Sequence, residues 1–411
     1  MKCPKIVHWG PLVTICLIAF HTLGTEIVLY RTWRDHEQPV YHSIVHMGLA
    51  FMLVLSYLCS MYLGPGEFPM AWEPADKREQ LQYCYQCERF KPPRAHHCRE
   101  CGTCCPKMDH HCPWINGCVG WKNQKAFVLF LLYVVLDGFH SMYIIGWRAY
   151  LLVHFGLVWR QPMLFADVFL VGSVAFAVWL AVGVLLFFQL RIVLRNRSDI
   201  EAWIMLKADD RRQPEEEPFA FPYTLSRRAN FAAVFGPSPL WWFIPTASHG
   251  NGLWWDVVEG CDQYTLTREQ LAQKRAKRKE AQLMRVTQPF NRGWFGCGWG
   301  HQTWRTHPSM DDERLAVEVS DLLLITRDKK HWLYGEKLTS EGEDLSMADR
   351  AKAHGWMPRT CAQELDTHSD EYAELAGEYF QLTTKPVQAV GKSTIDEETN
   401  ADMEAETKKN L

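Results

Sequence analysis

The chain carries almost no net charge. Its 411 residues include 44 Lys and Arg against 47 Asp and Glu, a formal charge of −3 at neutral pH. A chain this close to neutrality has no overall attraction to nucleic acid, so its partners must be inferred from local features. Residues 9–30, the first long apolar stretch of the chain, also lack a clean small-residue cleavage site, and further apolar stretches follow them. Both features favour a retained transmembrane span over a cleaved signal peptide.

Long apolar stretches, in contrast, are abundant. A helix needs roughly 20 apolar residues to cross the hydrocarbon core of a bilayer, and runs of that length are better explained by lipid than by a soluble core. The stretches that qualify are residues 9–30, 42–63, 126–150 and 168–190. The sequence therefore predicts four transmembrane helices.

Basic residues predict the orientation of these helices. Lys and Arg gather between the second and third apolar stretches and again directly after the fourth. Because basic residues mark cytosolic loops, both segments and both chain termini are expected in the cytosol. Thiols stay reduced there, so the cysteines between the second and third stretches are expected to bind metal or to catalyse, and not to form disulfides.

Residues 83–119 contain eight of the fourteen cysteines, together with four histidines. Cysteine pairs separated by two residues, Cys84 with Cys87 and Cys98 with Cys101, are the usual halves of tetrahedral zinc sites. A closed site takes four ligands, so two zinc ions would use eight of these twelve side chains. The segment has few apolar side chains to bury, and zinc binding would supply its folding energy instead.

Spacing alone does not decide which four side chains are left over. The run Asp109-His110-His111-Cys112 places a carboxylate, two imidazoles and a thiol side by side. A reactive cysteine needs thiolate character and a nearby base, and a carboxylate that orients that base is the logic of a catalytic triad. One histidine is therefore expected to bind metal while the other serves Cys112.

The segment from Cys84 to Asn123 resembles the cysteine-rich domain of the DHHC protein S-acyltransferases, membrane enzymes that move palmitate from palmitoyl-CoA to cytosolic cysteines. It also lies between the second and third spans, as it does in that family. The resemblance implies that Cys112 is the nucleophile, His110 its base and Asp109 the residue that orients the base. It also implies two structural Zn²⁺ ions, one held by Cys84, Cys87, His97 and Cys104 and the other by Cys98, Cys101, His111 and Cys118.

Three further stretches resemble the same family. Asn123 and Phe127 fit its Asn-x-x-x-Phe motif at the start of the third span. Residues 198–201 take the place of a Thr-Thr-x-Glu motif whose second threonine supports the catalytic aspartate; only the glutamate matches, and Asp199 is expected to work against that support. Residues 229–236 resemble a C-terminal motif whose asparagine, here Asn230, packs the cytosolic tail against the spans.

Several charged residues allow two interpretations. Arg99, Lys122 and Lys125 flank the cysteine-rich segment, where they either meet the phosphates of CoA or only follow the bias of basic residues toward the cytosol. Asp137 lies near the middle of the third span, where a carboxylate is costly. It either shapes a slot for the acyl chain or pairs with a neighbouring hydroxyl or imidazole such as His140, and we favour the second interpretation.

The C-terminal half has the pattern of a small β-barrel. Residues 318–326, 332–336 and 355–358 alternate like short strands, and their order resembles an SH3 domain. A charged connector over residues 265–285 is expected to form a solvated helix.

The C-terminal half also contains two cysteines and a polar tail. Cys297 and Cys361 are cytosolic thiols that could themselves accept acyl groups. The chain is polar from Pro386 onward, and it closes on Lys408-Lys409-Asn410-Leu411, which resembles a dilysine retrieval signal of endoplasmic reticulum membrane proteins.

The predicted fold is thus an α-helical polytopic membrane protein with an inserted two-zinc domain and a C-terminal SH3-like barrel. The combination resembles the endoplasmic reticulum branch of the DHHC family that carries an SH3-like domain. The expected parts are residues 1–66 (spans one and two), 67–125 (zinc domain), 126–194 (spans three and four), 195–284 (C-terminal motif and connector), 285–368 (SH3-like domain) and 369–411 (disordered tail).

The predicted activity is that of a protein S-palmitoyltransferase in the endoplasmic reticulum membrane. Its expected partners are palmitoyl-CoA, membrane proteins with cytosolic cysteines and a regulatory partner of the SH3-like domain, with no nucleic acid. The alternative is a zinc-binding membrane scaffold without activity. Asp109 and Cys112 argue against the scaffold, because zinc binding needs neither.

Overall fold

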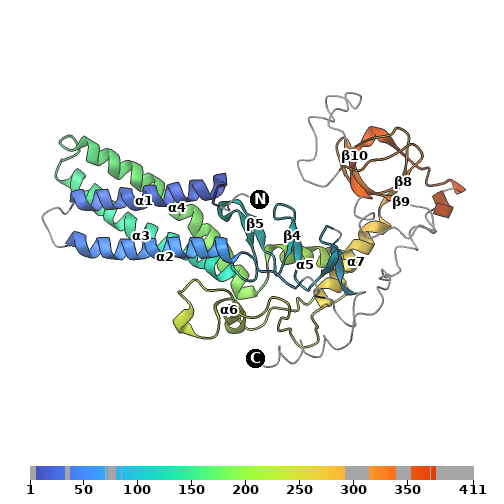
Figure 1. Ribbon diagram of the computed structural model, residues 1–411, viewed down its shortest axis with the longest axis horizontal. Coiled ribbons are helices and arrows are strands. Elements are labelled where there is room, and N and C mark those ends of the chain that lie inside the picture. Colours follow the sequence, from blue (N-terminus) through green and yellow to red (C-terminus); the bar gives the residue numbers. More distant parts are fainter. Residues whose placement is uncertain are drawn as a thin grey trace. The chain divides into compact units, whose positions relative to one another are not determined.

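The computed structural model describes residues 6–32, 38–69, 72, 80–84, 86–291, 314–338, 353–370 and 372–375 (Figure 1). Within these residues, four helices are long and apolar enough to cross a membrane, as predicted. They are α1 (Trp9–Thr32), α2 (Gln38–Leu63), α3 (Gln124–His154) and α4 (Pro162–Arg195). Helix α3 packs against α2 and α4, and α1 contacts all three of the others.

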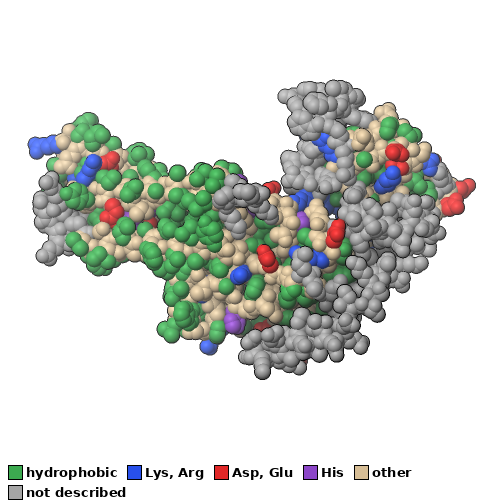
Figure 2. All heavy atoms as spheres, viewed as in Figure 1, with side chains coloured by type: hydrophobic (Ala, Val, Ile, Leu, Met, Phe, Trp, Pro, Cys, Tyr) green, Lys and Arg blue, Asp and Glu red, His purple; other side chains and the backbone are tan. Residues whose placement is uncertain are grey.

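The helical bundle has apolar side chains outside and several polar side chains inside. Figure 2 shows hydrophobic side chains covering its visible face, and Phe51, Phe139 and Phe169 each expose about two thirds of their surface. Inside the bundle, Ser60 and Ser141 are fully buried. This arrangement is the reverse of a soluble core and fits a lipid environment, in which outward apolar surface needs no cover.

Three short hairpins form the cysteine-rich module, as far as the chain is described. Strand β1 (Gln82–Cys84) pairs with β2 (Arg89–Lys91), β3 (His96–Cys98) with β4 (Thr103–Cys105), and β5 (His110–Cys112) with β6 (Gly117–Val119). The short helix η2 (Pro113–Ile115) connects β5 to β6. The register places His97 opposite Cys104 and His111 opposite Cys118, so the second and third hairpins each bring a histidine next to a cysteine.

The segment after α4 returns to the module and to the bundle. Helix α4 ends at Asn196 in the left-handed conformation, and α5 (Asp199–Arg211) begins at once with a capping box between Ser198 and Glu201. Helix α6 (Arg227–Phe235) packs against α4, and η3 (Pro239–Trp241) follows it. The amide of Asn230 donates to the carbonyl oxygen of Leu194, so it fastens α6 to the end of α4.

The connector is helical, as α7 (Thr265–Lys279), but it is not simply solvated. Its Leu266 and Glu269 are buried, because this face packs against α5. Glu269 accepts hydrogen bonds from Arg211, and Gln273 donates to the carbonyl oxygen of Ile204. The sequence did not predict this packing against α5, because α7 contains few apolar side chains to indicate a buried face.

The described residues of the C-terminal region form a five-stranded antiparallel sheet in the order β10-β9-β8-β7-β11. The strands are β7 (Gln282–Val286), β8 (Leu322–Lys329), β9 (Trp332–Leu338), β10 (His354–Pro358) and β11 (Ala362–Glu364), with η4 (Arg359–Cys361) before the last. This sheet is consistent with an SH3-like domain. Sequence patterns located β8, β9 and β10 but missed β7 and β11, and Cys297 and the dilysine ending lie outside the described residues.

Candidate active site

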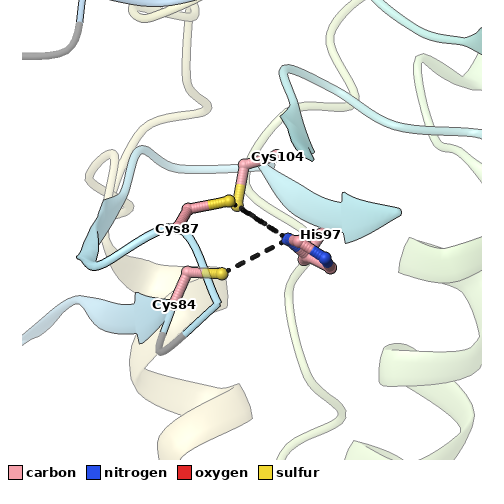
Figure 3. A group of neighbouring side chains, drawn as sticks. All are labelled: Cys84, Cys87, His97 and Cys104. Atoms are coloured by element: carbon pink, nitrogen blue, oxygen red, sulfur yellow. Dashed lines mark hydrogen bonds between the residues drawn. The ribbon is translucent and has the colours of Figure 1, made fainter. Parts of the chain in front are cut away.

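Figure 3 shows a first group of four candidate ligands, Cys84, Cys87, His97 and Cys104. Their donor atoms lie within 4.8 Å of one another. The Nδ1 atom of His97 lies 3.4 Å from Sγ of Cys84, 3.2 Å from Sγ of Cys87 and 3.8 Å from Sγ of Cys104. Sulfur and nitrogen donors around one tetrahedral zinc ion lie about 3.5 Å apart. These four residues therefore fit a zinc ion in number, chemistry and spacing.

A second group repeats this arrangement with Cys98, Cys101, His111 and Cys118. The Nδ1 atom of His111 lies 3.5 Å from Sγ of both Cys98 and Cys101 and 3.8 Å from Sγ of Cys118. The structure thus gathers all eight side chains that the family resemblance implies, and in the same two sets. Cys112 belongs to neither set.

Strand β5 explains why two neighbouring histidines take different positions. Successive side chains of a strand point to opposite faces, so His110 and Cys112 share one face while His111 faces the other way. His111 reaches the second ligand group from there, opposite Cys118. The face with His110 and Cys112 is directed to the cavity described below, which both residues line. The extended backbone therefore separates a ligand from a reactive pair.

His110 is held between Asp109 and Cys112. Its Nδ1 atom lies 2.8 Å from Oδ2 of Asp109, which leaves Nε2 for the thiol. Burial would lower the pKa of His110, but the hydrogen bonds with Asp109 and Cys112 outweigh it and raise that pKa to about 10. A charged imidazole beside a thiol favours the thiolate, which is the nucleophilic form of cysteine.

Asp109 itself is almost fully buried and has three hydrogen-bond donors. Besides His110, the amide of Gln189 donates to its Oδ2 at 3.0 Å and the backbone N–H of Asp199 donates to its Oδ1 at 3.2 Å. Burial would raise the pKa of Asp109, but these donors outweigh it and lower the pKa. The carboxylate therefore stays ionised and holds the imidazole in one orientation.

The expectation that Asp199 works against Asp109 holds for its side chain, but the backbone of Asp199 supports Asp109. Asp199 is the first residue of α5, and its backbone N–H is one of the amide groups that a helix start leaves without an internal partner. That N–H supports Asp109 whatever the side chain at this position. The two carboxyl groups nevertheless repel each other, and burial together with the nearby Asp109 raises the pKa of the Asp199 carboxyl. Gln189, which sequence reasoning did not select, gives the second support.

Arg94 is a further residue that sequence reasoning missed. Its guanidinium is buried and donates to both carboxylate oxygens of Glu201, at 2.6 and 2.8 Å, and to the carbonyl oxygen of Asn196 at 2.8 Å. It also stacks over the ring of Tyr223, 4.4 Å from the centroid. This contact fastens the cysteine-rich module to the turn between α4 and α5, which carries the backbone donor to Asp109.

An apolar cavity of about 420 Å³ opens at Cys112 and His110. Its wall on α3 repeats at helical spacing, from Phe127 to Gly138, which corresponds to about 16 Å along the helix axis. His21 and Asp137 line it as well. Helix α1 closes it near the thiol: a Cβ atom on Gly10 would lie 2.0 Å from the carbonyl oxygen of Pro113, so only glycine allows this approach.

Lys125 and Asp137 contact other partners than the sequence suggested. Lys125 turns its ammonium inward, where it donates to the carbonyl oxygen of Trp241 at 2.7 Å and to the hydroxyl of Thr246 at 2.8 Å, so it fastens a loop and is not turned toward a phosphate. Asp137 does lie near imidazoles, as favoured, but its partners are His21 and His46 and not His140. It also lines the cavity, so both interpretations of this residue hold in part.

The chain resembles known proteins over most of its length. Residues 77–205 match the family described as DHHC palmitoyltransferase. The chain is 34% identical over 401 residues to Palmitoyltransferase ZDHHC6 of Homo sapiens, which covers 90% of this chain and 94% of that protein. It is 34% identical over 394 residues to the protein of the same name from Danio rerio, covering 88% and 92%.

A plant protein matches more than half of the chain. Probable protein S-acyltransferase 16 of Arabidopsis thaliana is 30% identical over 265 residues, which is 59% of this chain and 90% of that protein. Relatives of this identity and coverage, together with the two ligand groups and the four apolar helices, leave one conclusion. The chain belongs to the DHHC palmitoyltransferase family, whose members are protein S-acyltransferases.

Proposed function

We propose that the chain transfers palmitate from palmitoyl-CoA to cytosolic cysteines of membrane proteins, through a thioester on Cys112. One observation carries this proposal. Cys112 lies outside both ligand groups, beside His110 and at the mouth of an apolar cavity. A thiol outside the metal sites, a basic imidazole beside it and a slot for a hydrocarbon chain are what an S-acyl intermediate requires.

The first step loads the enzyme. The Cys112 thiol gives its proton to His110, which thereby becomes the charged imidazole that its raised pKa favours, and the resulting thiolate attacks the thioester carbon of palmitoyl-CoA. A new C–S bond forms to Cys112 and the C–S bond to CoA breaks. The CoA thiolate takes the proton from His110 and leaves as the thiol, which makes His110 neutral again. Asp109 keeps His110 in the productive tautomer and stabilises its charge throughout.

The second step unloads it. A substrate thiol gives its proton to His110 and attacks the thioester on Cys112, so that the acyl group moves to the substrate and Cys112 leaves as thiolate. Both thioesters have similar energy, so the transfer depends on positioning. Water must be kept out, and the largely apolar lining beside Cys112 does this.

The two ligand groups would each hold a structural Zn²⁺. Each has four protein donors, which closes a tetrahedral site and leaves no open position for substrate or water. Metal binding supplies folding energy to hairpins that have little apolar core of their own. Their contribution to the reaction is to fix β5, and with it the shared face of His110 and Cys112.

The cavity fits the acyl chain. It runs beside α3 for about 16 Å from Cys112 and is almost wholly apolar until it reaches His21 and Asp137. Each CH₂ group gains about 0.8 kcal/mol in an apolar setting, so a long chain is bound much more strongly than a short one. The chain would lie among the helices while its thioester meets Cys112.

A non-catalytic scaffold is less well supported. A scaffold would need the zinc ligands but neither the 2.8 Å contact between His110 and Asp109 nor a cavity at Cys112.

The remaining parts of the proposal concern the location of the protein and its regulatory partner. We place the protein in the endoplasmic reticulum membrane with both termini cytosolic; the positions of its basic residues support the orientation. The SH3-like sheet would bind a regulatory partner.

The test replaces Cys112 by serine in the full-length protein. Incorporation of a clickable palmitate should be lost while zinc content stays at the wild-type value, because Cys112 belongs to neither ligand group. The matched control is Cys261→Ser, a half-buried cysteine after the spans that should label normally. Unchanged labelling of Cys112→Ser, or loss of its zinc, would contradict the assignment.

A further inference from the structure

A third group of metal-binding side chains lies inside the helical bundle, apart from the cysteine-rich module. It consists of His21 from α1, His46 from α2 and Asp137 from α3, whose ligand atoms lie within 4.8 Å of one another. His46 and Asp137 are completely buried. Asp137 lies thirteen residues after the start of α3, about 20 Å along the helix axis, so the group is deep within the span.

The carboxylate of Asp137 lacks the partners that its position demands. Its oxygens lie 3.2 Å from Nδ1 of His21 and 3.5 Å from Nε2 of His46, but neither contact has the geometry of a hydrogen bond. Nε2 of His21 and Nε2 of His46 are likewise buried without a hydrogen-bond partner in the described structure. A carboxylate within a bilayer needs a compensating partner, because lipid offers none.

The spacing of these atoms fits a shared cation. Nitrogen and oxygen donors bound to zinc at roughly 2.0–2.1 Å in tetrahedral geometry lie about 3.4 Å apart. The distances of 3.2 and 3.5 Å lie on either side of that value. The contacts of Asp137 with His21 and His46 are too poorly directed for hydrogen bonds, but their lengths are those expected between two donor atoms bound to one ion.

The surroundings of His46 show a second feature of metal sites. A histidine that binds metal through one nitrogen usually donates its other N–H to a carboxylate, which fixes the ring. Nδ1 of His46 lies 2.8 Å from Oε1 of Glu26, while Nε2 faces Asp137. Glu26 is in turn held by the hydroxyl of Ser43, which donates to its Oε2 at 2.8 Å. The ring is therefore oriented by an outer carboxylate.

We propose that His21, His46 and Asp137 bind a Zn²⁺ ion within the membrane. Two imidazoles and a carboxylate suit zinc. Charge supports the assignment as well, because a divalent ion balances the two negative charges of Asp137 and Glu26 and leaves a neutral cluster with neutral imidazoles. Neutrality is what a low-dielectric bilayer favours.

This ion would connect three spans at the closed end of the cavity. Its ligands come from α1, α2 and α3, and two of them, His21 and Asp137, also line the cavity that begins at Cys112. Three protein ligands leave one coordination position open. The metal site would thus form the polar end of the otherwise apolar cavity. This role does not depend on the reaction at Cys112.

The test counts metal in the full-length protein. Purified wild-type protein is equilibrated with Zn²⁺ in detergent, desalted and analysed by plasma mass spectrometry against protein concentration. We expect three zinc ions per chain, two from the cysteine-rich module and one from the bundle. A wild-type count of two would overturn the proposal and leave a group of buried ionisable side chains without metal.

Variants locate the third ion. Asp137→Asn and His46→Gln should each bind two zinc ions and elute as monodisperse protein, with the module intact. The matched control is His42→Gln, one turn earlier on α2 and outside the group, which should keep three. Three ions retained by both variants of the group would refute the location, and a variant that fails to fold leaves the wild-type count to decide.

Discussion

At the scale of single residues, the site separates two neighbouring histidines by the geometry of one strand. His110 and Cys112 lie on one face of β5 and His111 lies on the other, because side chains of a strand alternate. His110 contacts Asp109 at 2.8 Å, whereas His111 joins three cysteines. Adjacent positions of the same residue type should therefore respond differently to the same substitution.

We predict that His110→Ala lowers the rate of self-acylation by at least about a hundredfold, the usual contribution of a general base. Its zinc content should not change. His111→Ala should instead release one zinc ion and destabilise the module, since a closed site loses a ligand. Single-turnover labelling and metal analysis of both variants measure this, and equal zinc loss from both would show that the roles are assigned wrongly.

The burial of Cys361 argues against the hypothesis that this cysteine accepts acyl groups. Its side chain is completely buried in the core of the C-terminal sheet, and burial raises its pKa to about 12. A buried neutral thiol is inert. We predict that Cys361 carries no acyl group and reacts with maleimide only after denaturation, as read by peptide mass spectrometry. Modification of the native protein at Cys361 would contradict this burial.

At the scale of elements, the catalytic strand depends on contacts from other parts of the fold. The turn between α4 and α5 presents the backbone N–H of Asp199 to Asp109, and Arg94 fastens that turn through Glu201. Burial would raise the pKa of Glu201, but Arg94 outweighs it and lowers that pKa. The pair is thus charged, buried and bidentate.

Breaking this pair should be costly. Glu201→Gln leaves the buried guanidinium of Arg94 without its countercharge, and we expect a loss of about 3–5 kcal/mol in stability. Thermal unfolding at matched zinc content measures this, together with a slower acylation rate because Asp109 loses its support. The control is Arg268→Ala, which breaks an exposed pair with Asp262 and should cost less than about 1 kcal/mol. Similar losses from both variants would show that Arg94 is not an anchor.

At the scale of the whole molecule, the activity combines two environments. The spans supply an apolar cavity, and the cysteine-rich module places a polar reactive group at its mouth. The connections follow from the topology, since the module is inserted between α2 and α3 and the segment after α4 packs back onto both. In the proposed reaction, the acyl donor and the substrate thiol would therefore approach from the same side of the membrane.

We predict that this side is the cytosol. A glycosylation acceptor inserted into the short turn between α3 and α4, at residues 155–161, should be modified, because the proposed orientation places that turn in the lumen. The same acceptor at either terminus should stay unmodified. Mobility shifts in microsomes, reversed by a glycosidase, report the result. Modification at a terminus and not in the turn would invert the orientation that the basic residues indicate.

Much of this protein is determined by local sequence. The four spans follow from runs of apolar residues, since lipid demands a continuous apolar helix. The two ligand groups use short-range spacing within residues 84–118, because hairpins of a few residues bring such neighbours together. Strands β7 and β11 were missed, as each is short and gains its partners only by pairing across the sheet.

The sequence by itself thus determined the membrane class and the cysteine-rich module, and it placed Asp109, His110 and Cys112 side by side, because each of these features depends on neighbours along the chain. Only the tertiary structure decided what supports Asp109, which partners Asp137 has and where the cavity ends. Gln189 lies 80 residues from Asp109, and His21, His46 and Asp137 come from three separate helices. Such contacts depend on how helices pack and rotate, which no local pattern specifies.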